Sequence, residues 1–276
     1  MLTEKIHVAV PTAFNVNEDL DVTGTLNHVR NLSSQGVRSV LISGSTGEQH
    51  SMSLEEKLSL ISALKNEEEL LNKMEIIFGV SAIRQKEAEE LVKMINLTNI
   101  SGIMLGFPPY LIPTQTEALI YADRLIKMSN KPVIIYNNPK RTGFDLSSES
   151  MIKLCEHKLV IGLKDPGSKE KIKKIYQAVN VKTLYIYAGG EINLKEKLTS
   201  GYNRLSSIAG NVYPTEISVW FNKIIDEEKL SEKEAIIIKR IIEDIYNGSP
   251  LVNLKKLINN QGTAIGICRR PLGNSI

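Results

Sequence analysis

Short apolar runs rich in valine and isoleucine recur along the chain, and each is followed by a longer segment with apolar residues at helical spacing. Most of these runs are continuous rather than alternating, which is typical of parallel strands buried on both faces. The pattern predicts strands at residues 6–10, 39–43, 75–80, 102–106, 132–137, 160–165, 183–188 and 205–209.

The intervening segments have the spacing of amphipathic helices. The second of them opens on Ser53 with Glu56 three residues later, which is the signature of a capping box. The predicted helices are residues 17–35, 53–70, 84–97, 115–129, 147–157, 169–179, 192–200 and 215–226, and two further helical patterns follow at 231–246 and 250–259.

Eight strand–helix units over residues 6–226 give about 27 residues per unit, the period of a (β/α)8 barrel. A doubly wound open sheet is the alternative, but the first strand is followed by PTAFNVNEDL and not by a Gly-x-Gly-x-x-Gly turn. We therefore expect an α/β protein with one domain. Residues 1–226 would form a TIM barrel, and residues 227–276 a helical C-terminal extension.

Composition limits the kinds of partner and the compartment that we expect for the protein. Its 276 residues include 34 Lys+Arg and 31 Asp+Glu, so the net charge is only +3, which argues against nucleic-acid binding through a basic field. The two cysteines, Cys155 and Cys268, suit a reducing cytoplasm. The longest apolar runs are about half a dozen residues, far below the ~20 of a membrane span, and no signal-peptide pattern opens the chain. We expect a cytoplasmic protein without membrane contact.

The carboxyl ends of barrel strands are where an active site would lie. Lys164 ends the apolar run LVIGL, and a lysine at that depth loses hydration, which lowers its pKa. A neutral amine can attack a ketone and form a Schiff base. The alternative is a lysine just past the strand with its ammonium group in water.

Two more strand ends carry hydroxyl groups. Ser45 and Thr46 lie between glycines in SGSTGE, where tight turns and exposed amides can hold a carboxylate or phosphate. Tyr136 ends the fifth strand, and its phenol could transfer protons to and from a bound intermediate. The alternatives are an ordinary Gly/Ser turn with Glu48 near a helix start, and a half-buried strand tyrosine.

The loops beyond the strand ends add three candidates. Arg141 could hold a carboxylate in a bidentate clamp, or could be a surface arginine. Tyr110 lies among prolines after the fourth strand, where it could simply pack on them. The four histidines show no metal-ligand spacing, only His50 is near the proposed site, and there is no HExxH motif or P-loop. We expect no metal and no nucleotide.

Four segments together resemble the dihydrodipicolinate synthase / N-acetylneuraminate lyase family of class I pyruvate aldolases. They are residues 44–48, Tyr136-Asn137 with Pro139, residues 141–143 and residues 162–165. Their order and spacing agree along almost the whole chain, from VAVPTAF to RRPL. The resemblance implies a (β/α)8 barrel that needs no cofactor and assembles as a homotetramer or homodimer.

The resemblance also implies roles for these residues. Lys164 would form the Schiff base with the keto carbon of pyruvate, Tyr136 would shuttle protons, and Ser45 would be its relay. Tyr110 would reach into a neighbouring subunit's site, as a further catalytic residue. Substrate binding would fall to Thr46, Gly47, Arg141, Gly189 and Ser206, with Arg141 on the carboxylate of the second substrate.

The expected reaction is a condensation of pyruvate with an aldehyde. Arg141 and Tyr110 favour aspartate 4-semialdehyde, which would give 4-hydroxy-tetrahydrodipicolinate for lysine biosynthesis. Ser45, where synthases usually have threonine, resembles sialate lyases. The alternatives are therefore a pyruvate-releasing aldolase of N-acetylneuraminate or 2-keto-3-deoxy sugar acids, and a non-catalytic keto-acid-binding paralogue. By the same resemblance, synthases that are inhibited by lysine have histidines at the positions of Leu54 and Lys57. We therefore expect weak or absent inhibition by lysine.

Overall fold

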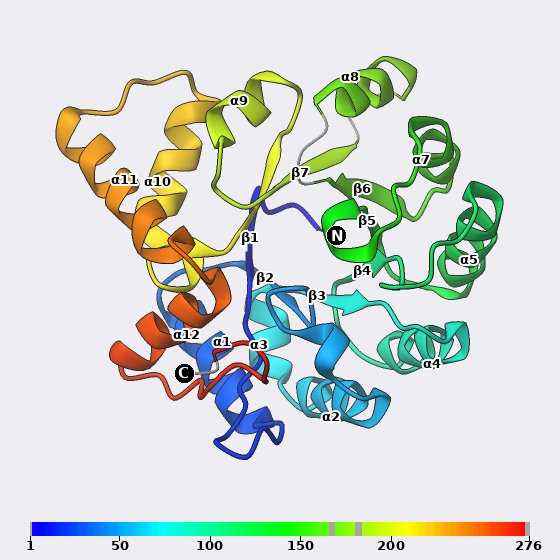
Figure 1. Cartoon of the computed structure of the whole chain (residues 1–276), viewed down its shortest axis with the longest axis horizontal. Coiled ribbons are helices and arrows are strands. Elements are labelled where there is room, and N and C mark those ends of the chain that lie inside the picture. The colour runs from blue at the N-terminus through cyan, green and yellow to red at the C-terminus, as the bar shows by residue number, and fades with distance from the viewer. Residues whose placement is uncertain (1, 166–168, 180–183, 274–276) are drawn as a thin grey trace.

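Eight parallel strands, paired in chain order, close into a barrel in the computed structural model, which describes residues 2–165, 169–179 and 184–273 (Figure 1). Closure is made by β1 and β8, whose residues Ile6 and Leu205 are partners in register. The predicted (β/α)8 fold is confirmed, and the open-sheet alternative is wrong. The strands are β1 (Ile6–Ala9), β2 (Ser39–Ile42), β3 (Glu75–Val80), β4 (Gly102–Gly106), β5 (Val133–Tyr136), β6 (Val160–Lys164), β7 (Tyr185–Gly189) and β8 (Arg204–Ser207).

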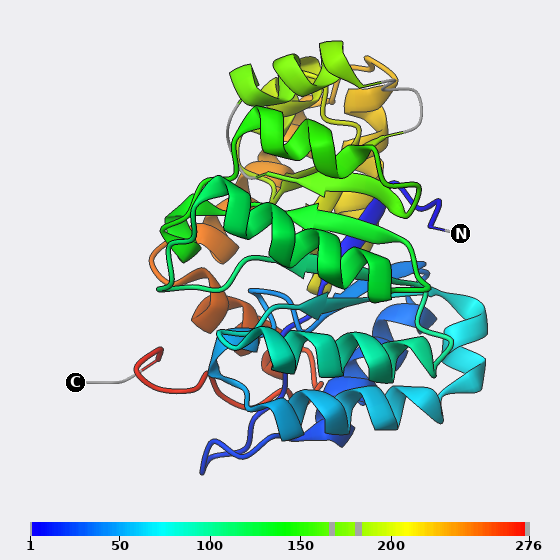
Figure 2. The same ribbon diagram turned by 90° about the vertical axis from the view of Figure 1, so that its right-hand side faces the viewer.

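Helices surround the barrel, and Figure 2 shows them lying along its outer wall. A short 3-10 helix, η1 (Gln49–Ser51), follows the turn after β2. The α-helices between the strands are α1 (Val22–Ser34), α2 (Leu54–Lys65), α3 (Glu68–Lys73), α4 (Gln85–Asn96), α5 (Gln115–Met128), α6 (Pro139–Thr142), α7 (Ser148–Cys155), α8 (Lys169–Ala178) and α9 (Leu194–Thr199). After β8 come η3 (Ala209–Asn211), α10 (Pro214–Ile225), α11 (Glu232–Tyr246) and α12 (Pro250–Asn260).

Several predicted boundaries differ from the structure for local reasons. The first helix starts at Val22 and not at residue 17, because the Asp21 side chain caps it by accepting from the Gly24 amide at 2.8 Å. The segment predicted as one helix at 53–70 is divided into α2 and α3, and Asn66 is the C-cap of α2. The capping box of Ser53 and Glu56 is confirmed.

The last two strands also deviate from the prediction. Thr183, predicted to begin the seventh strand, lies outside the described residues, and β7 runs from Tyr185 to Gly189. The eighth strand ends at Ser207, short of the predicted residue 209. There the Ile208 and Ala209 amides donate to the Glu191 carboxylate, at 3.0 and 3.1 Å, and the chain turns into η3.

The two faces of each strand bury different sets of side chains. Valines and isoleucines on the outer face pack against the helices in one large apolar cluster. The inside of the barrel is filled by a smaller cluster, so the barrel is packed and not a pore. That inner cluster contains Leu2, Ala9, Leu41, Ile77, Met104, Ile134 and Tyr187.

The C-terminal helices are tied to the loop after β2 by a buried ion pair. The Lys255 Nζ on α12 lies 2.7 Å from the Glu48 Oε1, and both side chains are 2% exposed. Arg269, beyond α12, donates its backbone amide to Glu48 at 2.9 Å. The extension therefore supports the SGSTGE turn, while the expected division into residues 1–226 and 227–276 stays a prediction.

No helix in the described parts of the chain is long and apolar enough to cross a membrane.

Replacing Lys255 by methionine should destabilise the fold, because it leaves the Glu48 carboxylate buried without its cation. Breaking a buried pair in this way costs about 3–5 kcal/mol. Urea unfolding of Lys255→Met measures the loss, and Lys256→Met, at the neighbouring exposed lysine, should stay within about 0.5 kcal/mol of the parent. Equal stabilities for the two variants would contradict the role given to the pair.

Candidate active site

Lys164 ends β6 with its amine inside the barrel. Its side chain is among the buried polar groups, at 8% exposure, and its Nζ donates a hydrogen bond to the Ser206 Oγ on β8 at 2.8 Å. The same Nζ lies 4.7 Å from the ring centroid of Tyr136 on β5, which pairs with Lys164 in register. The lysine head is therefore not in open water, as the alternative interpretation required.

Burial lowers the pKa of the Lys164 ammonium below its ordinary value, because desolvation disfavours the charged form. The charges of Tyr136 and Glu191 oppose this shift, and the nearby charge of Arg141 adds to it. A lowered pKa increases the fraction of neutral amine, which is the form that attacks a carbonyl.

The Tyr136 phenol lies between two polar side chains. Its oxygen is 3.2 Å from the Ser45 Oγ, and it accepts a hydrogen bond from the Asn138 Nδ2 at 2.6 Å. Burial by itself would raise the pKa of this phenol. The positive charge of Lys164 and the hydrogen bonds from Ser45 and Asn138 outweigh burial and lower the pKa below its ordinary value.

A cavity of about 280 Å³ is lined by Tyr136, Ser45 and Asn138 of this group. It has basic groups around its mouth, and the described residues that line it include no carboxylate, so it favours an anionic ligand. The lining residues are Ser45, Gln49, His50, Gly106, Phe107, Pro109, Tyr136, Asn138, Lys140, Arg141 and Thr142.

The turn that carries Ser45 is held in an unusual backbone conformation. Ser43 and Glu48, on its two sides, both have positive φ, 56° and 52°. Such angles are costly outside glycine and persist where surrounding structure enforces them. Gly79 on β3 makes room for the turn, because a Cβ there would lie 2.0 Å from the Ser43 carbonyl oxygen. The turn is thus packed against β3 on one side and anchored through Glu48 on the other.

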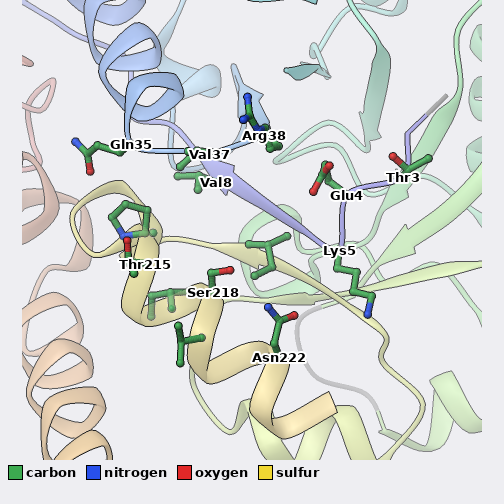
Figure 3. A pocket seen from close by; sticks show the side chains of 16 residues that line it. Thr3, Glu4, Lys5, Val8, Gln35, Val37, Arg38, Thr215, Ser218 and Asn222 are labelled. Atoms are coloured by element: carbon green, nitrogen blue, oxygen red, sulfur yellow. The ribbon is translucent and has the colours of Figure 1, made fainter. Parts of the chain in front are cut away.

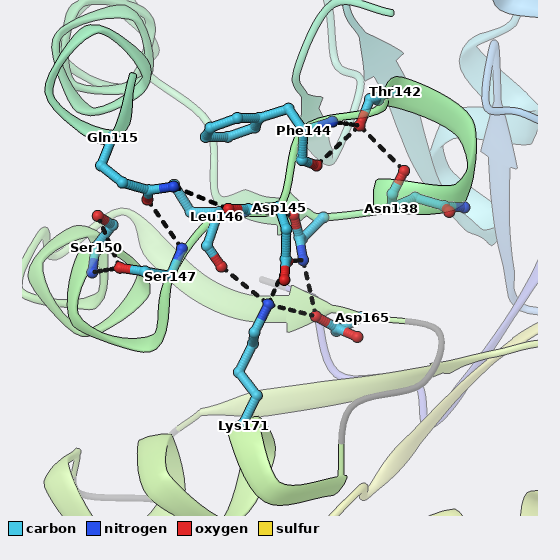
Figure 4. Close-up of polar contacts among 11 residues, drawn as sticks. Gln115, Asn138, Thr142, Phe144, Asp145, Leu146, Ser147, Ser150, Asp165 and Lys171 are labelled. Carbon is cyan, nitrogen blue, oxygen red and sulfur yellow. Dashed lines mark hydrogen bonds and ion pairs between the residues drawn. The ribbon is translucent and has the colours of Figure 1, made fainter. Parts of the chain in front are cut away.

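Asn137 and Asp165, which follow Tyr136 and Lys164, belong to a second network of hydrogen bonds and ion pairs (Figure 4). The Asn137 side-chain amide donates to Asp145 at 2.8 Å and to Asp165 at 2.9 Å, and Lys171 on α8 forms ion pairs with both carboxylates. Asn137 also accepts from the Leu146 amide at 3.0 Å. Because Asn137 and Asp165 directly follow Tyr136 and Lys164, this network fixes the ends of β5 and β6 relative to each other.

The structure brings most of the predicted site residues together. Lys164, Tyr136, Ser45 and Ser206 form one cluster, with Arg141 at the mouth of the cavity. Ser206 was expected to bind substrate, but its contact with the Lys164 amine was not anticipated from the sequence. Gly189 is the register partner of Ser206.

The other three predicted residues are not among these contacts. Gly47 packs against the segment that follows β1, where its carbonyl accepts from the Thr12 hydroxyl at 2.7 Å. Thr46 is partly exposed in the same turn. Tyr110 is 88% exposed and does not line the cavity, so its role toward a neighbouring subunit stays a prediction.

Sequence reasoning missed two residues around the cluster. Asn138 reaches Tyr136 from the N-cap of α6, a one-turn helix that apolar periodicity does not reveal. Glu191 is fully buried after β7 and accepts from the Ser207 Oγ at 2.5 Å and from the Tyr246 hydroxyl on α11. Its place two residues after a strand end is the signal that could have found it. Within the described residues, no group of three or more His, Cys, Asp or Glu side chains could hold a metal ion.

A larger hollow of about 570 Å³ lies between β1, the end of α1 and α10 (Figure 3). Its lining includes Lys5 and Arg38 near the amino ends of β1 and β2, and Thr215 and Ser218 on α10. None of the residues around Lys164 contributes to it. Of the two, only the smaller cavity is lined by predicted site residues, among them Ser45, Tyr136 and Arg141.

Comparison with known proteins identifies the family of the chain. A family model described as the dihydrodipicolinate synthetase family matches residues 2–275. The chain belongs to that family, and thus to the pyruvate-dependent lyases of class I aldolase type.

Two relatives are named 4-hydroxy-tetrahydrodipicolinate synthase. The one from Wigglesworthia glossinidia brevipalpis is 33% identical over 181 residues, which are 65% of this chain and only 59% of that protein. The one from Ligilactobacillus salivarius (strain UCC118) is 25% identical over 272 residues, covering 97% of this chain and 92% of that protein.

Solved structures share the fold at lower identity. Dihydrodipicolinate synthase from Aquifex aeolicus has a TM-score of 0.87 at 21% identity, covering 99% of this chain and 92% of its own. A variant of the Sulfolobus solfataricus 2-keto-3-deoxygluconate aldolase has a TM-score of 0.82 at 22% identity, covering 98% and 90%. Synthases and sugar-acid aldolases thus share this barrel, and the likeness shows the fold alone.

Proposed function

We propose that this protein condenses pyruvate with aspartate 4-semialdehyde through a Schiff base on Lys164, giving 4-hydroxy-tetrahydrodipicolinate. The observation that carries the proposal is a buried lysine amine next to a phenol that is itself within reach of a serine hydroxyl. The synthase names of the relatives support the choice of product.

The chemistry needs a nucleophile and repeated proton transfers. The neutral Lys164 amine attacks the keto carbon of pyruvate, and loss of water from the adduct gives an iminium ion. The cationic nitrogen withdraws electrons, so the pyruvate methyl group loses a proton and becomes a nucleophilic enamine that attacks the aldehyde. Carbon–carbon bond formation restores the iminium ion. The amine of the aldehyde substrate then attacks the iminium carbon, closes the ring and displaces the Lys164 amine, which frees the product and regenerates the lysine. Tyr136 exchanges these protons, with Ser45 as its relay. Thr46 and Gly47, in the same turn, would present amides to the pyruvate carboxylate, and Gly189 would line the site beside Ser206.

Arg141 would select the second substrate. Its guanidinium lines the mouth of the cavity, where a carboxylate of the incoming aldehyde can be held in a bidentate pair. Aspartate 4-semialdehyde carries such a carboxylate next to its amine. The proposal places the protein in the cytoplasm, which suits the two free thiols of Cys155 and Cys268.

A second candidate is an aldolase that releases pyruvate from N-acetylneuraminate or a 2-keto-3-deoxy sugar acid. The observation in its favour is Ser45 at the position of the relay hydroxyl, together with the fold shared with a sugar-acid aldolase. Both candidates need the same Schiff base, so they differ only in the second substrate. A keto-acid-binding protein without turnover would need neither a relay nor a neutral amine.

Steady-state rates separate these candidates. Condensation of pyruvate with aspartate 4-semialdehyde should be faster than cleavage of N-acetylneuraminate or 2-keto-3-deoxygluconate, and Lys164→Ala should abolish every activity. Faster cleavage of a sugar acid would contradict the proposed substrate and favour the aldolase. Thermal stabilisation by pyruvate without turnover on any partner would favour a binding protein.

We also infer that the protein forms a homodimer or homotetramer in which Tyr110 faces a second copy. Tyr110, Leu111 and Ile112 are 88%, 46% and 70% exposed, and Ile83 beside them is 55% exposed. Contiguous exposed apolar side chains of this kind mark interaction surfaces. The positive φ of Tyr110, 72°, is a strained conformation that fits a functional position.

Ile112→Asp should dissociate this assembly, because it places a charge in the apolar contact. Sedimentation velocity should show a smaller species for Ile112→Asp and an unchanged one for Tyr110→Phe. If Tyr110 also supplies its hydroxyl to a partner's site, Tyr110→Phe lowers kcat by at least about tenfold with the assembly intact. A monomeric parent protein would contradict the inferred assembly, and a fully active Tyr110→Phe would contradict only the catalytic role of its hydroxyl.

A further inference from the structure

We propose that Asn138 is a positioning residue for proton transfer, because its side-chain amide donates to the Tyr136 phenol and favours the phenolate form. The inference rests on the role proposed above for Tyr136, and it gives a function to a residue that the Schiff-base chemistry itself does not require.

The geometry shows which group donates in the hydrogen bond between Asn138 and Tyr136, and therefore where the phenol proton can point. The Asn138 Nδ2 is 2.6 Å from the Tyr136 oxygen, closer than the Ser45 Oγ at 3.2 Å. An amide NH2 group can only donate, so the phenol oxygen accepts from Asn138. The proton of the phenol is then left to point toward the Ser45 hydroxyl or a bound ligand, which are the groups with which Tyr136 must exchange it.

The backbone explains why the amide of Asn138 is held in place. Asn138 precedes Pro139, and a residue before proline is kept out of the helical region. Its φ of −147° and ψ of 81° agree with that restriction. Its carbonyl accepts from the amides of Arg141 and Thr142, both at 3.0 Å, so α6 fixes the residue at its first turn. The same turn thus sets both the phenol's hydrogen bond and the position of Arg141.

The neighbouring asparagine shows what a purely structural amide looks like in this molecule. Asn137 is fully buried and donates to the carboxylates of Asp145 and Asp165. Asn138 instead lines the cavity, and within the described residues its side chain makes one hydrogen bond, to Tyr136. Two adjacent amides therefore point to different partners, and only Asn138 contacts the proposed proton shuttle.

Several other charged or titratable groups face the same phenol or its cavity. Burial raises the pKa of Tyr136, whereas the positive charges of Lys164 on β6 and Arg141 on α6 lower it. Lys140 on α6 and His50 on η1 line the cavity. The Asn138 substitutions do not change these groups, so a difference between Asn138→Leu and the parent reports on the amide.

The test is a titration of Tyr136 without any substrate. Nuclear magnetic resonance of protein labelled with carbon-13 at the tyrosine Cζ follows each phenol, and the spectrum of Tyr136→Phe assigns the signal. Loss of the donor in Asn138→Leu should raise the titration midpoint of Tyr136 by about one pH unit. Asn138→Asp, which replaces the donor by a carboxylate of the same shape, should raise it further. Asn260→Asp, at an exposed asparagine on α12, should leave it unchanged.

The same variants give a kinetic readout. The limb of the pH–rate profile that belongs to Tyr136 should move to higher pH in the order Asn138→Leu, then Asn138→Asp, while KM for pyruvate changes little. A Tyr136 midpoint equal to that of the parent in folded Asn138→Leu would overturn the proposal, because this variant removes the donor without adding a charge. The titration needs no turnover, so a shifted midpoint in a protein that lacks lyase activity would contradict the proposed function and leave the hydrogen bond established.

Discussion

The burial of one lysine amine at the end of β6 is the constraint around which the active-site end of the barrel is organised. Lys164 reaches into a low-dielectric space where its ammonium form is disfavoured, and its contacts there are the Ser206 hydroxyl and the Tyr136 ring. A buried ammonium with a carboxylate in direct contact would stay charged. A hydroxyl acceptor instead satisfies an N–H of the amine without fixing the proton on it, which suits a nucleophile.

The surrounding structure holds this amine and the phenol in one geometry. Asn137 and Asp165 link the ends of β5 and β6, and Glu48 ties the Ser45 turn to α12 through Lys255. The Glu191 carboxylate accepts from the Ile208 amide just after β8 and from the Tyr246 hydroxyl of α11. Each of these contacts joins an element of the barrel's catalytic end to a neighbour, so the C-terminal helices are part of what positions the site.

The parts of the site that could be predicted are those that depend on strand periodicity. Lys164 and Tyr136 each end an apolar run, Ser45 lies in the turn after one, and parallel strands bring such ends to one edge. Asn138 and the Glu48–Lys255 pair depend on the exact turn of α6 and on residues far apart in sequence, for which apolar patterning carries no signal. The strand end at Ser207 was missed for the same reason, because side-chain acceptors end the ladder there.

Borohydride trapping with pyruvate tests the central claim most directly. Reduction of the iminium ion should leave one reduced pyruvyl group, and peptide mass spectrometry should find it on Lys164. The adduct should vanish in Lys164→Ala and persist in Lys197→Met, because Lys197 is equally buried, at 8% exposure, but lies on α9. Folded protein that gives no adduct, or an adduct that remains in Lys164→Ala, would contradict the account.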